Sequence, residues 1–164
     1  EFNITYFFIL KALEYASKIH KNQTRNFGNE PYINHPIRVA KNPEVLNYNW
    51  EGICVAFLHD CIEDADYPKE VDQYIQKNFS DKIYEAVKLL THNRLEKSYE
   101  EYIETIMTSG NEIAIAVKYA DSLDNSILTS TMDEKWIERC KIYRSNSQKY
   151  LNILRGIQND KPSD

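Results

Sequence analysis

Few residues in this chain interrupt regular secondary structure. Its 164 residues include only four glycines and five prolines. Helical periodicity recurs along most of the chain, and no convincing run of alternating apolar and polar residues predicts a strand. The length predicts one domain, residues 1–164, large enough for a hydrophobic core. We therefore expect an all-α protein, with helices at about residues 3–21, 34–41, 49–62, 68–78, 80–90, 97–108, 111–128 and 133–157.

The chain also lacks the cysteine pattern of a disulfide framework or a zinc knuckle. Its three cysteines, Cys54, Cys61 and Cys140, are an odd number and form no CxxC motif. This pattern is typical of a reducing compartment. No signal peptide is evident, and we expect the protein in the cytoplasm.

Long apolar runs and net positive charge are missing as well. The apolar run at residues 7–10 is followed too soon by Lys11 and Glu14 to predict a membrane span. The formal net charge of −5 argues against a general nucleic-acid binder, which needs a basic face. A local basic pocket for one small phosphorylated ligand remains compatible with this charge.

What the chain does contain is a dense group of titratable side chains, HDCIED at residues 59–64. The segment before it is apolar enough to predict a buried helix. If that helix continues, Glu63 lies one turn beyond His59, and Asp64 one turn beyond Asp60. Carboxylates beside a core are unfavourable unless a metal, hydrogen bonds or solvent compensate them. The alternative is a solvated helix C-terminus, although carboxylates there oppose the helix dipole.

Two histidines and two aspartates form a candidate metal site: His35, His59, Asp60 and Asp121. The segment around Asp121 reads as a largely buried helix that carries Asn125 one turn later. Mixed nitrogen and oxygen ligands suit Mn²⁺, Fe²⁺ or Zn²⁺ and are typical of catalytic metal sites. Each motif alone has a simpler explanation, since a His-Asp pair often marks a helix end and a histidine before proline can simply begin a helix.

Four segments in this order resemble the HD hydrolase domain of RelA/SpoT proteins. They are ASKIHKNQTR (16–25), GNEPYINHPIRVA (28–40), FLHDCIED (57–64) and VKYADSLDN (117–125). The likeness covers roughly residues 10–130. The chain has no room for the synthetase and regulatory domains of long RelA/SpoT proteins, so it is most similar to the small stand-alone alarmone hydrolases, which include metazoan SpoT homologues.

This resemblance implies an all-α HD-domain helical bundle with Mn²⁺-dependent activity, Fe²⁺ and Zn²⁺ being less favoured. The expected substrate is guanosine tetra- or pentaphosphate, from which the enzyme would remove the 3′-pyrophosphate and release GDP or GTP. The implied metal ligands are His35, His59, Asp60 and Asp121. The implied catalytic pair is Glu63 and Asp64.

The same resemblance implies a set of substrate-binding residues. Arg25 would contact the guanine base, and Asn125 the ribose. Arg139 and Tyr143 would face the phosphates and the sugar. The expected partner is thus a small nucleotide, with no nucleic acid or membrane involved, while the oligomeric state is left open.

Three positions depart from the family pattern and keep other functions open. Asn26 and Ser122 stand where the family usually has basic residues, and Asp124 stands where it often has histidine or tyrosine. Each change removes positive or aromatic character near the expected nucleotide. One alternative is therefore an HD phosphohydrolase acting on another nucleotide or on NADPH. Another is a catalytically silent nucleotide sensor.

Two further cations could take part in this site or in packing. Arg38 lies one helical turn from His35 and could face phosphate or pair with Glu51. Lys118 precedes Asp121 by one turn and could either support that carboxylate or reach phosphate.

Overall fold

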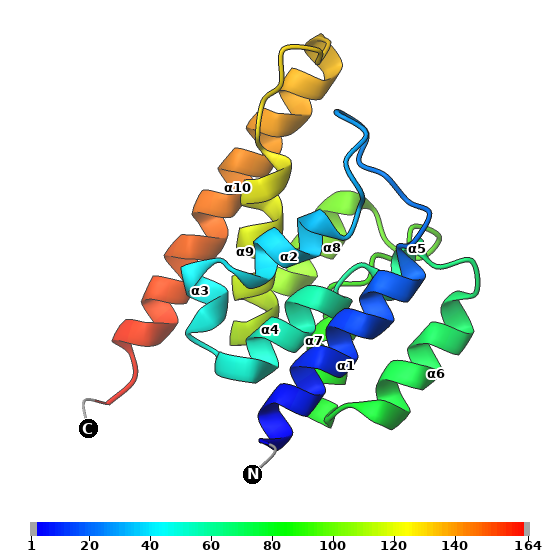
Figure 1. Ribbon diagram of the computed structural model, residues 1–164. Coiled ribbons are helices and arrows are strands. Elements are labelled where there is room, and N and C mark those ends of the chain that lie inside the picture. The colour runs from blue at the N-terminus through cyan, green and yellow to red at the C-terminus, as the bar shows by residue number, and fades with distance from the viewer. Residues whose placement is uncertain (1–2, 163–164) are drawn as a thin grey trace.

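The computed structural model describes residues 3–162, and these fold almost entirely into helices (Figure 1). In chain order the helices are α1 (Ile4–Ile19), α2 (Asn34–Ala40), α3 (Pro43–Leu46), α4 (Asn49–Leu58), α5 (Cys61–Asp64), α6 (Pro68–Asn78), α7 (Asp81–Leu89), α8 (Tyr99–Met107), α9 (Glu112–Asn125) and α10 (Glu134–Asn159). The described residues contain no strand, and their one isolated β-bridge joins Thr24 to Pro31. The all-α prediction is confirmed.

Polar caps begin most of the longer helices. Ser80 accepts a hydrogen bond from the Ile83 backbone N–H at the start of α7, and Asp133 caps α10 through the Trp136 N–H. Such caps satisfy backbone donors that have no partner inside the helix.

The structure corrects the predicted helix 49–62, which is two helices. α4 ends at Leu58, and α5 begins at Cys61. The last carbonyls of a helix have no backbone partner. Here His59 Nδ1 lies 2.6 Å from the Ala56 oxygen, and the Cys61 thiol donates to the Phe57 oxygen at 3.7 Å. The break sets the HDCIED segment at the end of a buried helix.

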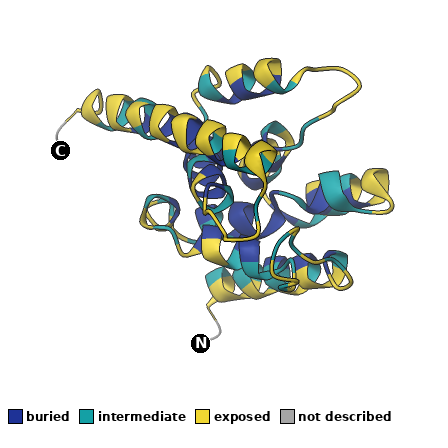
Figure 2. Ribbon diagram, turned by 90° about the horizontal axis from the view of Figure 1, so that it is seen from above, coloured by how far each residue is buried: buried dark blue, intermediate teal, exposed yellow. Residues whose placement is uncertain are grey.

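Helix α4 lies at the centre of the fold. It packs against α1, α2, α3, α7 and α9, while α10 runs along α9 on one side of the molecule (Figure 1). Buried residues gather in the middle, and the outer faces of the surrounding helices are exposed (Figure 2). The central position of α4 and α9 brings the ends of both helices beside α2, which places the predicted metal ligands together.

The longest segment between two helices of the described residues is 20–33, which joins α1 to α2. It turns at Gly28 and Asn29, which both have positive φ angles of 80° and 51°. Backbone hydrogen bonds between Arg25 and Glu30 and between Tyr32 and Gln23 hold its two arms together. Arg25 is therefore carried by an ordered turn.

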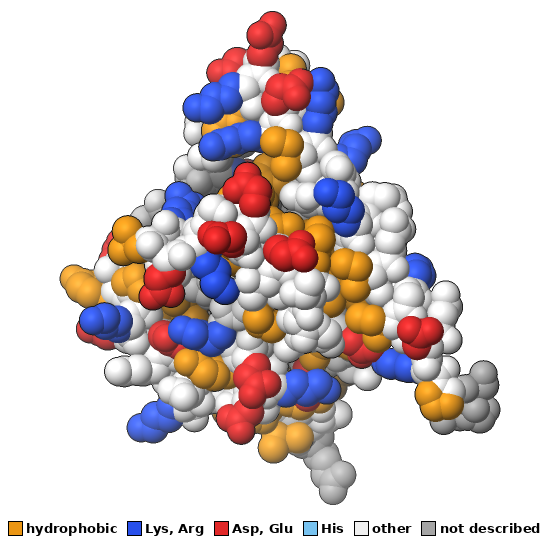
Figure 3. All heavy atoms as spheres, turned by 180° about the vertical axis from the view of Figure 1, so that it is seen from behind, with side chains coloured by type: hydrophobic (Ala, Val, Ile, Leu, Met, Phe, Trp, Pro, Cys, Tyr) orange, Lys and Arg blue, Asp and Glu red, His pale blue; other side chains and the backbone are white. Residues whose placement is uncertain are grey.

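The surface carries charges of both signs. On the face opposite to that of Figure 1, Lys and Arg side chains are interspersed with Asp and Glu (Figure 3). Among the helices of residues 3–162, none is both long and apolar enough to cross a membrane.

Candidate metal centre

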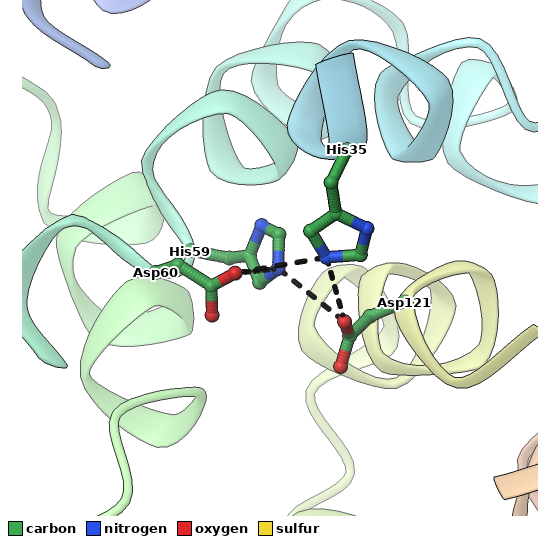
Figure 4. Close-up of side chains that lie close together, drawn as sticks. All are labelled: His35, His59, Asp60 and Asp121. Carbon is green, nitrogen blue, oxygen red and sulfur yellow. Dashed lines mark hydrogen bonds and ion pairs between the residues drawn. The ribbon is translucent and has the colours of Figure 1, made fainter. Parts of the chain in front are cut away.

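The four predicted metal ligands converge from three parts of the chain (Figure 4). His35 lies on α2, His59 and Asp60 follow α4, and Asp121 lies on α9. One nitrogen or oxygen of each lies within 4.8 Å of the others. His35 Nε2 is 3.0 Å from Asp121 Oδ1 and 3.6 Å from Asp60 Oδ2. A cluster of this size matches the reach of one coordinated cation.

Each imidazole is oriented by a hydrogen bond at its outer nitrogen. His35 Nδ1 lies 2.7 Å from Asp124 Oδ2, and His59 Nδ1 lies 2.6 Å from the Ala56 oxygen. Both partners are acceptors, so each Nδ1 carries the proton. Each Nε2 is then the ring nitrogen directed at the cluster, and it has a lone pair for a metal once its own proton is lost. This is the usual arrangement of histidine ligands in metal sites.

One buried polar atom supports a metal at this point. His59 Nε2 has no hydrogen-bond partner among the described residues, although Asp60 Oδ2 lies 3.0 Å away without hydrogen-bond geometry. Unpartnered buried nitrogen is rare in folded proteins. A cation bound by His35, His59, Asp60 and Asp121 would satisfy it, so the donor set fits a divalent metal.

Both carboxylates are held by neighbouring side chains. Lys118 Nζ donates to Asp121 Oδ2 and Asn125 Nδ2 to Asp121 Oδ1, each at 2.8 Å. The Tyr32 hydroxyl donates to Asp60 Oδ2 at 2.6 Å. Lys118 thus supports Asp121 directly, as one reading of the sequence proposed.

The cluster strongly perturbs its own protonation. Burial disfavours charged imidazole, but Asp60 and Asp121 raise the pKa of His59 well above its usual value. Burial likewise opposes ionisation of Asp121, but the ammonium of Lys118 and its histidine neighbours hold the pKa of that carboxyl well below its usual range. Metal ligands must be deprotonated, so a bound cation would displace the imidazole protons.

The predicted catalytic pair lies beside this cluster on α5. Glu63 accepts the His92 backbone N–H at 2.8 Å, and the Arg94 guanidinium lies 3.6 Å away. Asp64 is partly buried, and this burial, together with the charges of Asp60 and Glu63, raises its pKa to about 7. A carboxyl with this pKa can donate or accept a proton near neutrality.

A cleft of about 710 Å³ joins the metal cluster to the predicted substrate residues. Its wall includes both predicted catalytic carboxylates and all the predicted substrate residues: Glu63, Asp64, Arg25, Asn125, Arg139 and Tyr143. Asp60 and Asp121 reach the same wall, whereas His35 and His59 are buried behind it. Arg94 and Lys118 add positive charge to the cleft.

A second cavity, of about 410 Å³, adjoins the first and shares Arg25 and Asn125 with it. The Arg25 guanidinium donates to Asn125 Oδ1 at 2.8 Å. Apolar side chains, including Phe27, Ile127 and Met132, line the second cavity. This pairing of a charged cleft with a partly apolar cavity suits a ligand with phosphates at one end and a ring at the other.

The contacts of Asp124 were not predicted, and of the two alternatives for Arg38 the pairing with Glu51 is wrong. Arg38 contacts Glu30 and Asp124 at 2.6 and 2.7 Å, whereas Glu51 pairs with Lys82. No spacing rule could find these contacts, because the partners of Asp124 lie on α2, far away in the chain.

Of the three residues that depart from the family pattern, two line the cavities and one does not. Asn26 lines both cavities, and Asp124 lines the smaller one. Ser122 is buried and lines neither cavity, and the expectation that this change lies near the nucleotide stays a prediction.

Comparison with known proteins agrees with this geometry. The HD domain family model matches residues 12–130, most of the chain. The chain belongs to the HD domain family. Its RelA/SpoT resemblance is also confirmed. A guanosine-3′,5′-bis(diphosphate) 3′-pyrophosphohydrolase of Aquifex aeolicus is 34% identical over 71% of this chain and 17% of its own length. A probable enzyme of the same name from Mycoplasma pneumoniae is 28% identical over 82% of this chain and 19% of its own length.

A solved structure supports the fold over nearly the whole chain. It is described as a metazoan ortholog of SpoT that hydrolyses ppGpp and plays a role in starvation responses. It is 26% identical, has a TM-score of 0.68, and the match covers 91% of this chain and 86% of that one. The expected HD-domain bundle is therefore confirmed. The chain spans less than a fifth of the two curated relatives named above.

Proposed function

We propose that this chain is one HD-type phosphohydrolase domain that removes the 3′-pyrophosphate of guanosine tetra- or pentaphosphate. The products would be pyrophosphate and GDP or GTP. The observation that carries the proposal is one cleft in which the metal cluster, the Glu63–Asp64 pair and several cations meet. The names of the similar proteins support the same substrate. Three free cysteines are consistent with a cytoplasmic location.

The metal we propose is Mn²⁺, held by His35, His59, Asp60 and Asp121. When bound, such a cation supplies Lewis acidity and lowers the pKa of a water molecule. Two imidazoles and two carboxylates suit Mn²⁺, with Fe²⁺ and Zn²⁺ as competitors. The protein's own part is to fix each ring by a hydrogen bond at Nδ1, so that Nε2 is the nitrogen directed inward and its proton is the one a bound cation displaces.

Glu63 and Asp64 would handle the protons of the reaction. Hydrolysis adds the hydroxyl of water to phosphorus and breaks the bond to the ribose 3′-oxygen, which leaves with a proton. One carboxylate must therefore accept a proton, and one carboxyl must donate it. Asp64, with a pKa of about 7, can carry that proton near neutral pH. Glu63 is held at the cleft wall by the His92 N–H.

The remaining cleft residues would position the nucleotide. Arg139 and Tyr143, one helical turn apart on α10, would contact the phosphates and sugar. Arg25 offers a planar guanidinium for the base, and Asn125 an amide for the ribose. The partly apolar second cavity beside Arg25 is the place for the base.

A second candidate substrate is another phosphorylated nucleotide, such as NADPH. The observation that favours it is Asn26, an uncharged residue that lines both cavities at a position where the family usually has a cation. The binding of a substrate that carries less negative charge near Arg25 would be weakened less by an uncharged residue at position 26.

The test is metal-dependent turnover of several nucleotides by the same protein. Guanosine tetraphosphate, guanosine pentaphosphate, GTP and NADPH are compared with Mn²⁺ and with excess chelator. We expect turnover of the two alarmones only with Mn²⁺, and its loss in Asp60→Ala and Glu63→Ala. Preference for NADPH would replace the alarmone assignment. Turnover that persists in both variants would refute the proposed site.

A further inference from the structure

Asp124 makes the contact that orients the most deeply buried metal ligand. His35 has no exposed side-chain surface, and its Nδ1 lies 2.7 Å from Asp124 Oδ2. The other ring nitrogen, Nε2, faces Asp121 and Asp60. An imidazole fixed at one nitrogen by a carboxylate can present the other to a metal in only one orientation and one tautomer.

Asp124 is itself held from the opposite side. Arg38 Nε donates to Asp124 Oδ1 at 2.7 Å, and its terminal nitrogen donates to Oδ2 at 3.1 Å. The same guanidinium makes two hydrogen bonds to Glu30, at 3.0 and 2.6 Å. A planar guanidinium that binds two carboxylates in this way has little rotational freedom. The chain of contacts runs from Glu30 through Arg38 and Asp124 to His35.

The Asp124 carboxylate lies between two cationic or hydrogen-bonding partners, with His35 Nδ1 at 2.7 Å from Oδ2 and Arg38 Nε at 2.7 Å from Oδ1. An ionised carboxylate makes the imidazole a stronger electron-pair donor than a neutral partner does.

We propose that Asp124, held by Arg38, is a positioning residue that orients His35 and strengthens it as a metal ligand. The inference rests on the metal site of the proposed function and extends it to residues beyond the four ligands. Asp124 does not touch the metal position or the cleft wall that carries Glu63 and Asp64. Its effect should therefore appear in metal binding itself, before any substrate is present.

The experiment measures Mn²⁺ affinity by calorimetry and the visible absorption spectrum of the Co²⁺-loaded protein, which reports ligand geometry. The variants are Asp124→Ala, Asp124→Asn and Arg38→Met, with folding checked by circular dichroism. Outer partners of metal ligands typically contribute about 10–100-fold to metal affinity. We expect a weakening of that order in Asp124→Ala with an altered Co²⁺ spectrum, and smaller losses in the other two.

A matched control breaks a similar arginine–carboxylate pair elsewhere. Glu44 accepts two hydrogen bonds from Arg155, at 3.4 and 2.6 Å, and neither residue lines a cavity described above. Glu44→Gln should leave Mn²⁺ affinity and the Co²⁺ spectrum unchanged.

The possible failures are distinct. A folded Asp124→Ala protein with wild-type Mn²⁺ affinity and an unchanged Co²⁺ spectrum would overturn the role of Asp124. If Asp124→Ala does not fold, unchanged affinity in both Asp124→Asn and Arg38→Met would overturn it. A wild-type protein that binds neither ion would instead contradict the metal site on which the proposed function depends.

Discussion

The buried ion pair between Lys118 and Asp121 gives the sharpest prediction about stability. The pair is 2.8 Å long, and its side chains are only 11% and 6% exposed. Replacing Lys118 by methionine keeps most of the side-chain volume but leaves the carboxylate of Asp121 without its cation. Removing one partner of a buried pair typically destabilises a protein by about 3–5 kcal/mol.

For a chain of this size, about 1 kcal/mol lowers Tm by roughly 2–4 °C, so the expected drop is on the order of 6–20 °C. The assay is urea unfolding of metal-free Lys118→Met and wild-type protein at pH 7, repeated with saturating Mn²⁺. Mn²⁺ should reduce the loss, because a cation coordinated by Asp121 replaces part of the missing charge.

The control is Lys88→Met. Lys88 pairs with Asp72 at 2.7 Å, but these side chains are 42% and 27% exposed. An exposed pair contributes about 0–1 kcal/mol, so this variant should unfold almost as the wild type does. Equal losses in the two lysine variants, or a loss in Lys118→Met that Mn²⁺ does not reduce, would refute the reasoning.

Three other predictions concern protons and packing. Because neighbouring carboxylates raise the pKa values of His35 and His59, Mn²⁺ binding should release protons and tighten from pH 6 to pH 8. Calorimetry in two buffers of different ionisation enthalpy measures the number of protons released, and a Mn²⁺ affinity that does not change with pH would contradict the prediction. The folded-state pKa of Asp64, about 7, lies above that of an unfolded aspartate, so its protonation stabilises the metal-free fold at low pH, and this contribution is lost as pH rises through about 7. Asp64→Asn should therefore lose less unfolding free energy than wild type between pH 5 and pH 8, and parallel pH profiles would speak against it. Finally, Gly52→Ala should destabilise the fold by about 1–3 kcal/mol, because the new methyl group would lie 2.5 Å from the Val45 oxygen. In the same urea assay, Gly156→Ala should stabilise α10 by about 0.5–1 kcal/mol, because its methyl group meets nothing within 4 Å.

Much of the architecture follows from local features of the sequence. The scarcity of glycine and proline and the 3.6-residue periodicity predict helices, and Ser80 and Asp133 mark two of their starts correctly. Helical periodicity and helix caps depend on residues that are close together in the sequence, so they can be predicted from it. The short helix α3 and the break between α4 and α5 were not predicted. The side chains of His59 and Cys61 stabilise this break by contacting nearby backbone carbonyls. Such contacts leave no periodic pattern in the sequence.

The candidate site shows the same division. The four metal ligands could be proposed because their motifs are separately recognisable, and the structure brings them together. The contacts that support these ligands could not be proposed from the sequence, because they join residues that are far apart in the chain. Asp124 looked like a loss of aromatic character, whereas its carboxylate lies 2.7 Å from His35, 89 positions away in sequence. Arg38 likewise takes partners that spacing on its own helix does not indicate.

The most direct test of the proposed function follows the phosphorus nuclei of guanosine tetraphosphate by NMR in the presence of the Mn²⁺-loaded protein, with the metal removed before the spectra are recorded. We expect the 3′-diphosphate signals to disappear and pyrophosphate and GDP to appear in equal amounts. Release of single phosphates, or an unchanged nucleotide after prolonged incubation with metal-loaded protein, would contradict it.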